Sequence, residues 1–175
     1  MTRRKIEVVP HDPEWARLFE REARELAEVF GPELVAVRHI GSTAIPGIHA
    51  KPIIDMLLEV RDIQRVDAFN EGMIARGYRP QGEFGIPGRR FFIKGDDAHR
   101  THHLHAFGTG SPRIARHLTF RDYLIAHPAE ARAYSRLKQR LARQFPHDIE
   151  AYMDGKDGLI KEIERKAAAW AAAPP

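Results

Sequence analysis

Apolar and polar positions follow two different periods in the first part of the chain, and each period predicts a different element. Over residues 13–30 the apolar side chains recur at helical spacing, with Asp12 placed to cap the helix and Gly31 to end it. Residues 34–40 alternate as a strand does, and residues 53–60 are apolar on both faces except at their acids, which is typical of a strand buried on both sides. The pattern therefore predicts one helix followed by two strands.

The rest of the chain divides into a short mixed region and a long helical one. Residues 63–76 have helical spacing, and residues 90–94 and 102–107 are expected to pair as antiparallel strands after a turn-rich stretch. From residue 111 onward the pattern is helical, and the Ala- and Pro-rich tail from Ala167 to Pro175 is expected to fray. We predict the α/β (α+β) class. One domain would span residues 1–175, with a small mixed sheet packed by helices in about residues 1–110 and a helical part in about residues 111–170.

Composition narrows the classes of function. The chain has 175 residues, 43% of them hydrophobic, which suits a single domain with a sizeable core. It contains no cysteine, so disulfides, thiolate catalysis and cysteine-ligated metals are excluded. No stretch is apolar enough for a membrane span and no leader pattern is evident, so we expect a cytoplasmic protein. The net charge of +4 favours phosphate-bearing small molecules over nucleic acid, and ten histidines are the compositional excess to explain.

The clearest chemical motif runs from His39 through Gly41, Ser42 and Thr43, and Asp55 follows it. A strand that ends in Gly-Ser turns tightly, and the backbone N–H groups of such a turn can cradle a phosphate, with the two hydroxyls as further donors. An aspartate within an apolar strand is costly to bury unless it is paired or coordinates a cation. Two interpretations stay open. The motif holds a nucleotide phosphate beside a divalent metal, or it is an ordinary turn with Asp55 bonded to backbone N–H groups.

Residues 39–47, HIGSTAIPG, and residues 51–55, KPIID, resemble the signature of the GrpB family. The likeness extends to residues 103–105 and 120–124 and to Tyr152 with Lys156, so it spans most of the chain. The resemblance implies the nucleotidyltransferase fold, in which a Gly-Ser turn leads into a helix between strands and receives nucleotide phosphates. It also implies that strand carboxylates hold two magnesium ions, with Asp55 as the matching ligand here.

One position departs from this pattern. Nucleotidyl transfer normally uses two carboxylates at alternate residues of a strand, because these share a face and can bridge metals. The second position here is Leu57, and Glu59 lies about 13 Å along the strand from Asp55, at about 3.3 Å per residue. A single carboxylate binds Mg²⁺ weakly unless other groups or substrate phosphates contribute.

Two histidines offer a partial replacement for the missing carboxylate. His103 and His105 alternate along one strand and therefore share a face. If that strand lies beside Asp55, as the resemblance implies, the three residues would suit Mn²⁺, Zn²⁺ or Fe²⁺, or His105 would act as a general base. His102 is expected to decorate a strand edge, and His117 matches only half of a two-histidine phosphoesterase motif.

The basic residues form two groups. The first is a stripe at helical spacing opposite apolar positions, expected to face solvent rather than nucleic acid, and consists of Arg132, Arg136, Arg140 and Arg143. The second contains the candidates for anion binding, which are Lys51, Arg89, Arg90, Tyr152 and Lys156. Tyr152 and Lys156 are four residues apart and would meet on one helix face. The resemblance implies that Lys156 reaches the triphosphate, because a lysine of the helical part does so in related folds. A plain surface position is the alternative for Lys156.

These inferences predict a metal-dependent, nucleotidyltransferase-like protein. It would bind a nucleoside triphosphate such as ATP with Mg²⁺ or Mn²⁺ and transfer a nucleotidyl group to a small acceptor. Asp55 and His105 would be catalytic, Asp55, His103 and His105 would hold the metal, and the nucleotide would lie on Gly41, Ser42, Thr43, Lys51, Tyr152 and Lys156. The alternative is a non-catalytic nucleotide- or phospholigand-binding module, which Leu57 favours.

Overall fold

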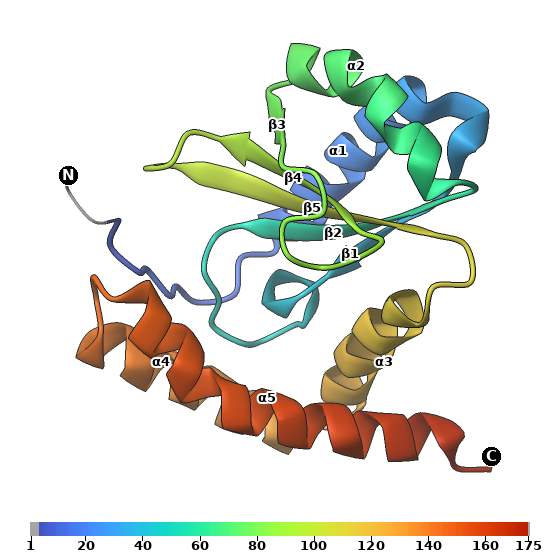
Figure 1. Cartoon of the computed structure of the whole chain (residues 1–175). Helices are drawn as coiled ribbons and strands as arrows, with labels where there is room; N and C mark the ends of the chain where they lie inside the picture. Colours follow the sequence, from blue (N-terminus) through green and yellow to red (C-terminus); the bar gives the residue numbers. More distant parts are fainter. Residues whose placement is uncertain (1–3, 175) are drawn as a thin grey trace.

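The computed structural model describes residues 4–174, and its central feature is a mixed sheet with the strand order β1-β2-β5-β4-β3 (Figure 1). The strands are β1 (Leu34–Ile40), β2 (Ile54–Val60), β3 (Tyr78–Pro80), β4 (Arg90–Gly95) and β5 (Arg100–Gly108). β2 and β5 run parallel, and the other neighbouring strands are antiparallel. The strands that carry Asp55 and the His103/His105 pair are therefore neighbours in the interior of the sheet.

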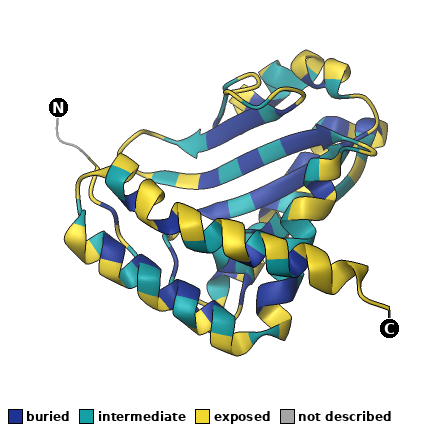
Figure 2. Ribbon diagram, turned by 60° about the horizontal axis from the view of Figure 1, so that its bottom comes forward, coloured by how far each residue is buried: buried dark blue, intermediate teal, exposed yellow. Residues whose placement is uncertain are grey.

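Helices pack against the sheet from both sides. α1 (Glu14–Phe30) and α2 (Asn70–Ala75) share one apolar core with β2 and β5. α3 (Pro112–Ala126), α4 (Pro128–Gln144) and α5 (Ile149–Ala172) lie on the other side, where they pack largely on one another (Figure 1). Burial is concentrated in the strands, and exposure on the outer sides of the helices (Figure 2). The predicted class is confirmed: a mixed sheet packed by helices precedes a helical C-terminal region.

The beginning and end of α1 follow directly from the sequence. Oδ1 of Asp12 accepts a hydrogen bond from the backbone N–H of Glu14 at 2.9 Å, so the predicted cap is confirmed. Gly31 follows the helix with φ of +51°, in the left-handed region that favours glycine. Trp15, Leu26 and Phe30 are buried on the inner face, as their spacing predicts.

α4 has one apolar and one basic face. All four arginines of the predicted stripe are exposed, whereas Tyr134 and Leu141 are buried, so the expectation that the stripe faces solvent is confirmed. The buried face also contains Lys138, of which only 2% is exposed. Of the helices described, none combines the length and apolar character needed to cross a membrane.

Three local predictions are wrong. The Gly-Ser turn leads into a single 3-10 turn, Ser42–Ala44, rather than a helix, because Pro46 and Gly47 follow at once. β3 lies in the stretch assigned to turns, where a three-residue strand gives too short a pattern to detect. The C-terminal tail does not fray at residue 167, since α5 continues to Ala172 and the Trp170 ring packs on those of Tyr123 and His127.

The segment predicted as a helix over residues 63–76 is helical but changes type along its length. It begins as a 3-10 helix, Ile63–Phe69, and continues as α2. The side chain of Asp62 accepts a hydrogen bond from the N–H of Gln64 at 2.9 Å and caps the first turn. Apolar spacing located this helix, but spacing alone does not separate the two helix types.

Candidate functional site

Asp55 and the two histidines meet because the parallel pairing of β2 and β5 sets Asp55 beside His103 and Leu57 beside His105. Alternate residues share a face of the sheet, so these side chains point to the same side. Oδ1 of Asp55 lies 3.7 Å from Nδ1 of His103 and 3.5 Å from Nε2 of His105. The Asp55 side chain keeps 33% of its surface exposed. The expected neighbourhood is confirmed, and its carboxylate is accessible to a ligand.

The charges of this cluster are set by burial and by its own members. Burial alone would raise the pKa of Asp55, but the contact with His105 and the charges of His103 and Lys51 together lower it. Burial lowers the pKa of His103 to about 4, against the opposing pull of Asp55. At neutral pH the site therefore holds a carboxylate anion beside a neutral His103 imidazole.

Gly41 brings the backbone against this carboxylate. It follows β1 with φ of +71°, and a Cβ at this position would lie 2.8 Å from Oδ2 of Asp55. The 3-10 turn begins at Ser42, so its first N–H groups have no partner within the turn. Oγ1 of Thr43 lies 2.8 Å from Nε2 of His39, and Thr43 is buried. Thr43 therefore stabilises the turn, while Gly41 lies against the carboxylate.

His39 acts as a support for this turn. Its ring stacks on that of Phe19 at 4.9 Å, and burial lowers its pKa to about 4. Its backbone carbonyl accepts a hydrogen bond from Nη1 of Arg121 at 3.0 Å. These contacts fix the end of β1 against α1 and α3 from two directions.

Arg89 determines how His105 faces Asp55. Nη1 of the buried Arg89 lies 3.2 Å from Nδ1 of His105. A guanidinium can only donate, so Nδ1 must accept and the ring proton sits on Nε2, which faces Asp55. His105 is thereby oriented as a donor toward the carboxylate. The sequence prediction of Arg89 as an anion-binding residue did not foresee this contact.

The fit of a divalent cation depends on the donors around Asp55. Among residues 4–174, no group of three or more His, Asp or Glu side chains is arranged to hold a metal ion. A metal-bound histidine normally donates its second N–H to an acceptor, and Arg89 is a donor, so His105 is poorly suited to ligation. Leu57 is fully buried in an apolar cluster under α3. These residues do not fit a metal site in which every ligand is a protein side chain. Asp55 alone does fit as one ligand of a divalent cation whose other ligands are phosphate oxygens.

Three lysines bring positive charge toward the same carboxylate. Nζ of Lys51 and Nζ of Lys156 lie 5.4 and 4.7 Å from the centroid of the Tyr152 ring. Nζ of Lys138 donates a hydrogen bond to the carbonyl oxygen of His49 at 2.6 Å. Within residues 4–174 none of the three forms an ion pair, and the carboxylate whose charge acts on all of them is Asp55. Removing a lysine cation from water without an ion-pair partner costs free energy, so this cluster is suited to binding an anion.

Burial changes the titration of these lysines. It lowers the pKa of Lys138 to about 7, and the charges of Lys156 and Lys51 act in the same direction. It lowers the pKa of Lys156 to about 8, with Lys51 again adding to the effect. The hydroxyl of Tyr152 is buried beside them without a hydrogen-bond partner among the described residues. The three lysines, with Tyr152, are called the lysine cluster below.

Lys138 is the residue of the lysine cluster that the sequence predictions missed. It lies four residues after Tyr134 and three before Leu141, on the apolar stripe of α4. A lysine inside such a stripe is rare unless its amine has a function or a partner. Nζ of Lys138 lies 4.6 Å from the centroid of the buried Tyr134 ring on the same face of α4.

Two other histidines have positions that the sequence did not indicate. The ring of His117 on α3 lies 5.7 Å from that of His105, and burial lowers its pKa to about 4. His102 does not lie at an exposed edge. It is buried on the opposite face of β5, where its Nε2 is 3.9 Å from the carboxylate of Glu22.

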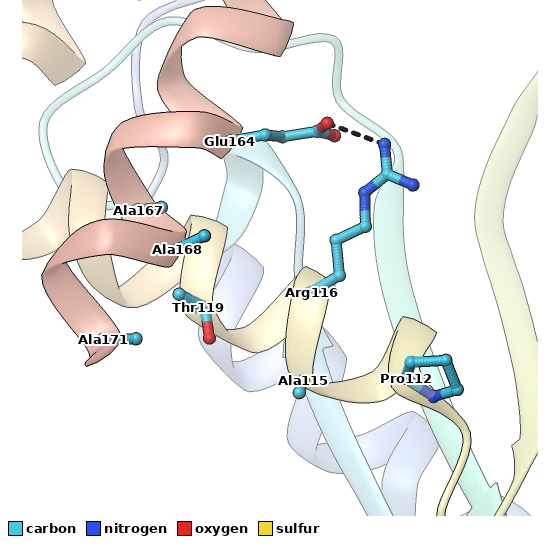
Figure 3. Close-up of a pocket in the computed structure, with 8 residues that line it drawn as sticks. All are labelled: Pro112, Ala115, Arg116, Thr119, Glu164, Ala167, Ala168 and Ala171. Carbon is cyan, nitrogen blue, oxygen red and sulfur yellow. Dashed lines mark hydrogen bonds and ion pairs between the residues drawn. The ribbon is translucent and has the colours of Figure 1, made fainter.

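Two surface grooves lie away from this cluster. One groove runs between α3 and α5, is lined mainly by small side chains such as Ala115, Thr119 and Ala168, and is crossed by the Arg116–Glu164 ion pair at 2.6 Å (Figure 3). Another lies between residues 46–48 and the junction of α3 and α4. Neither is lined by Asp55 or by the lysine cluster, so the chemistry and the apolar grooves occupy different surfaces.

Fold and site together define a class of small α/β protein in which a glycine turn, one carboxylate and three lysines, two of them buried, lie on one side of a mixed sheet. The family model described as GrpB protein matches residues 5–166. The chain belongs to the GrpB family, and the resemblance carried by residues 39–55 is confirmed.

Known relatives support this assignment. The UPF0157 protein YqkA of Bacillus subtilis is 52% identical over 168 residues, which cover 96% of this chain and 49% of YqkA, so the chain spans about half of that relative's length. The crystal structure of the conserved protein GrpB from Enterococcus faecalis superimposes with a TM-score of 0.91 at 41% identity, covering 95% of this chain and all of that one. A much weaker likeness, with a TM-score of 0.46 at 11% identity over 75% of this chain and 45% of the other, is to the Cid1 poly(U) polymerase.

Proposed function

We propose that this protein binds a nucleoside triphosphate as its complex with a divalent cation and transfers a nucleotidyl group from it to a small acceptor. The observation that carries the proposal is a set of three lysines on which the charge of Asp55 acts: Lys51 is half-buried, Lys138 and Lys156 are buried, and none forms an ion pair among the described residues. The backbone at Gly41 lies against the same carboxylate. A triphosphate supplies the negative charge that these lysines lack, and its oxygens are ligands that Mg²⁺ and Mn²⁺ prefer. ATP is the first nucleotide to test.

The lysine cluster and the turn would hold the phosphates. Lys51, Lys138 and Lys156 would neutralise their charge, and the unpartnered Tyr152 hydroxyl would donate a hydrogen bond to one phosphate oxygen. Gly41 would let the backbone come close enough for its neighbouring N–H groups to contribute. Binding would thus provide a counter-charge for groups that are costly to bury alone.

The carboxylate side of the site would act on the reacting phosphate. Asp55 would ligate the cation that the nucleotide brings. His103, whose buried Nε2 has no acceptor among the described residues, would lie beside Asp55 as a neutral imidazole. His105, oriented by Arg89, would position Asp55. In the transfer, the hydroxyl or amine of the acceptor forms a bond to the α-phosphorus, the bond from the α-phosphorus to the bridging oxygen breaks, and pyrophosphate leaves. The proton of the acceptor passes to solvent.

A non-catalytic nucleotide-binding module is the second candidate, and Leu57 is the observation that favours it. Leu57 occupies the position of the second carboxylate and is fully buried among apolar side chains. A site with one carboxylate can hold a metal–nucleotide complex without supporting two-metal catalysis.

Pyrophosphate release distinguishes the two candidates. The protein is incubated with ATP, Mg²⁺ or Mn²⁺, and a pool of small hydroxyl and amine compounds, and pyrophosphate is measured. Release that is lost in Asp55→Asn and retained in Glu59→Gln supports transfer. Nucleotide binding without release supports the module, and absence of nucleotide binding contradicts both.

A further inference from the structure

A row of aromatic rings extends from beside Asp55 to the exposed side chain of Phe84. Crossing the sheet from β2 to β5 and β4, Asp55 is followed by His103 and His105, whose rings lie 5.4 and 5.0 Å from that of Phe91. The ring of Phe84 stacks on Phe91 at 5.3 Å with an interplanar angle of 28°. Phe91 is buried, whereas 59% of Phe84 is exposed. Phe84 is therefore the outer layer of the stack, with its surface open to solvent.

The loop that carries Phe84 is fixed to the site. Nη2 of Arg89 donates a hydrogen bond to the carbonyl oxygen of Phe84 at 2.9 Å, and Nε donates to that of Glu83 at 3.2 Å. The same guanidinium contacts His105 and lies 4.7 Å above the ring of Phe91. Ile86, two residues further on, packs on the apolar cluster beneath α3. The loop between β3 and β4 thus lies against the sheet beside the reacting groups (Figure 1).

Phe84 occupies this place at a conformational cost. Among residues 4–174, Phe84 is the non-glycine residue with a positive φ, which is +49°. Gly82, Gly85 and Gly88 in the same loop also have positive φ. The backbone conformation of Phe84 has a structural reason, because it directs the carbonyl group to Arg89. The ring covers Phe91 with one face, but 59% of the residue stays exposed, at a position where a small polar residue such as asparagine adopts the backbone conformation more readily. Residues held in such regions are concentrated at ligand sites.

We propose that the outer face of the Phe84 ring stacks on the nucleobase of the bound nucleotide, and this inference rests on the proposed function. The lysine cluster would hold the phosphates on the side of the C-terminal helices, and the base would extend across the histidines to the β4 side of the sheet. Stacking on an aromatic face is tolerant of base identity, so the site would accept several nucleoside triphosphates. Phe84 would be a binding residue, and Arg89 would position both it and His105.

Titration calorimetry with two probes tests this inference. Mg·ATP carries a base, and inorganic tripolyphosphate with Mg²⁺ does not. Phe84→Asn keeps a residue that tolerates positive φ, and we expect it to weaken Mg·ATP binding about tenfold while leaving tripolyphosphate binding unchanged. Phe84→Tyr should keep the wild-type affinity for both. Ile74→Asn, which replaces a similarly exposed side chain on α2, is the matched control and should change neither.

The outcomes separate this inference from the proposed function. Unchanged Mg·ATP affinity in Phe84→Asn overturns base stacking while leaving the phosphate site intact. An equal loss of Mg·ATP and tripolyphosphate binding in that variant also overturns it, because the ring would then support the loop rather than the base. A wild-type protein that binds neither probe contradicts the proposed function and, with it, this inference.

Discussion

At the scale of single residues, Gly41 and Leu57 constrain the site in opposite ways. Gly41 lies where the backbone passes so close to Oδ2 of Asp55 that a methyl group has no room. Leu57, two residues after Asp55 on the same face of β2, belongs to the apolar core. Gly41 allows the backbone to lie against the charged carboxylate of Asp55. Leu57 places an apolar side chain on the same strand, where a second carboxylate would otherwise add charge. Both identities follow from local geometry.

Gly41→Ala should destabilise the protein more than Gly47→Ala. Both glycines have positive φ, +71° and +79°, so each substitution costs about 1–2 kcal/mol of backbone strain. Only at Gly41 does the new Cβ meet another group, Asp55, and a Cβ at Gly47 meets nothing within 4 Å. Urea denaturation measures the difference. Equal losses of unfolding free energy would show that the approach to Asp55 carries no constraint.

Leu57→Asp should not restore a second metal carboxylate and should instead disrupt folding. The side chain is fully buried in an apolar cluster, so the charge would be removed from water. The expected cost exceeds the loss in Leu57→Ala, for which about 2–5 kcal/mol is typical of buried leucines. Circular dichroism in urea measures both variants. A stable Leu57→Asp protein would contradict the assignment of this position to the core.

At the scale of elements, the site depends on a strand pairing and on two helix faces. Parallel pairing of β2 and β5 aligns Asp55 with His103 and His105. α4 and α5 direct Lys138 and Lys156 toward the same region from the other side. The strands supply the carboxylate and the imidazoles, and the helices supply the cations. Substitutions on the strands should therefore affect binding of the cation, and substitutions of the helix lysines should affect binding of the phosphates.

The pH dependence of stability should reveal the buried lysines. The pKa of Lys138 is lowered to about 7 and that of Lys156 to about 8, whereas a lysine in the unfolded chain titrates near 10.4. Between these values the unfolded chain binds more protons than the folded one, so the unfolding free energy rises as pH increases from about 7 to about 10. Lys138→Met should reduce this rise, and the exposed Lys161→Met should not. An identical pH dependence in Lys138→Met and wild type would contradict the assignment.

Much of this arrangement is predictable from the sequence, for identifiable reasons. Helix ends with local caps, such as Asp12 on α1, and strands with clear alternation are encoded by neighbouring residues. The adjacency of Asp55 and the His103/His105 pair required a family resemblance, because strand order is not a local property. Lys138 and the contact of Arg89 with His105 depend on tertiary packing, so local patterns did not indicate their roles. β3 was missed because its three residues carry too little periodicity.

At the scale of the whole molecule, histidines are gathered around the site in neutral form. Burial lowers the pKa values of His39, His103 and His117 to about 4. Free histidine titrates near 6.5, so between these values the unfolded chain binds more protons than the folded one. Folding stability therefore rises with pH from about 4 to about 6.5, and acid unfolding should begin within this interval.

Substitution of one of these histidines checks the origin of the acid sensitivity. His117→Gln should lessen the loss of unfolding free energy between about pH 6.5 and about pH 4.5, because one group that must remain neutral is removed. Guanidinium denaturation at both pH values provides the measurement. A variant that loses as much stability as wild type over this interval would assign the acid sensitivity to other groups.

The central claim is that the lysine cluster, beside Asp55, is an anion site of triphosphate size. Titration calorimetry of wild type and the single variants Lys51→Met, Lys138→Met and Lys156→Met with Mg²⁺ and tripolyphosphate tests it most directly, with the exposed Lys161→Met as the control. We expect saturable binding in wild type and in Lys161→Met, and at least about tenfold weaker binding in each of the other three variants. Absence of binding in wild type, or equal affinity in all four variants, would contradict it.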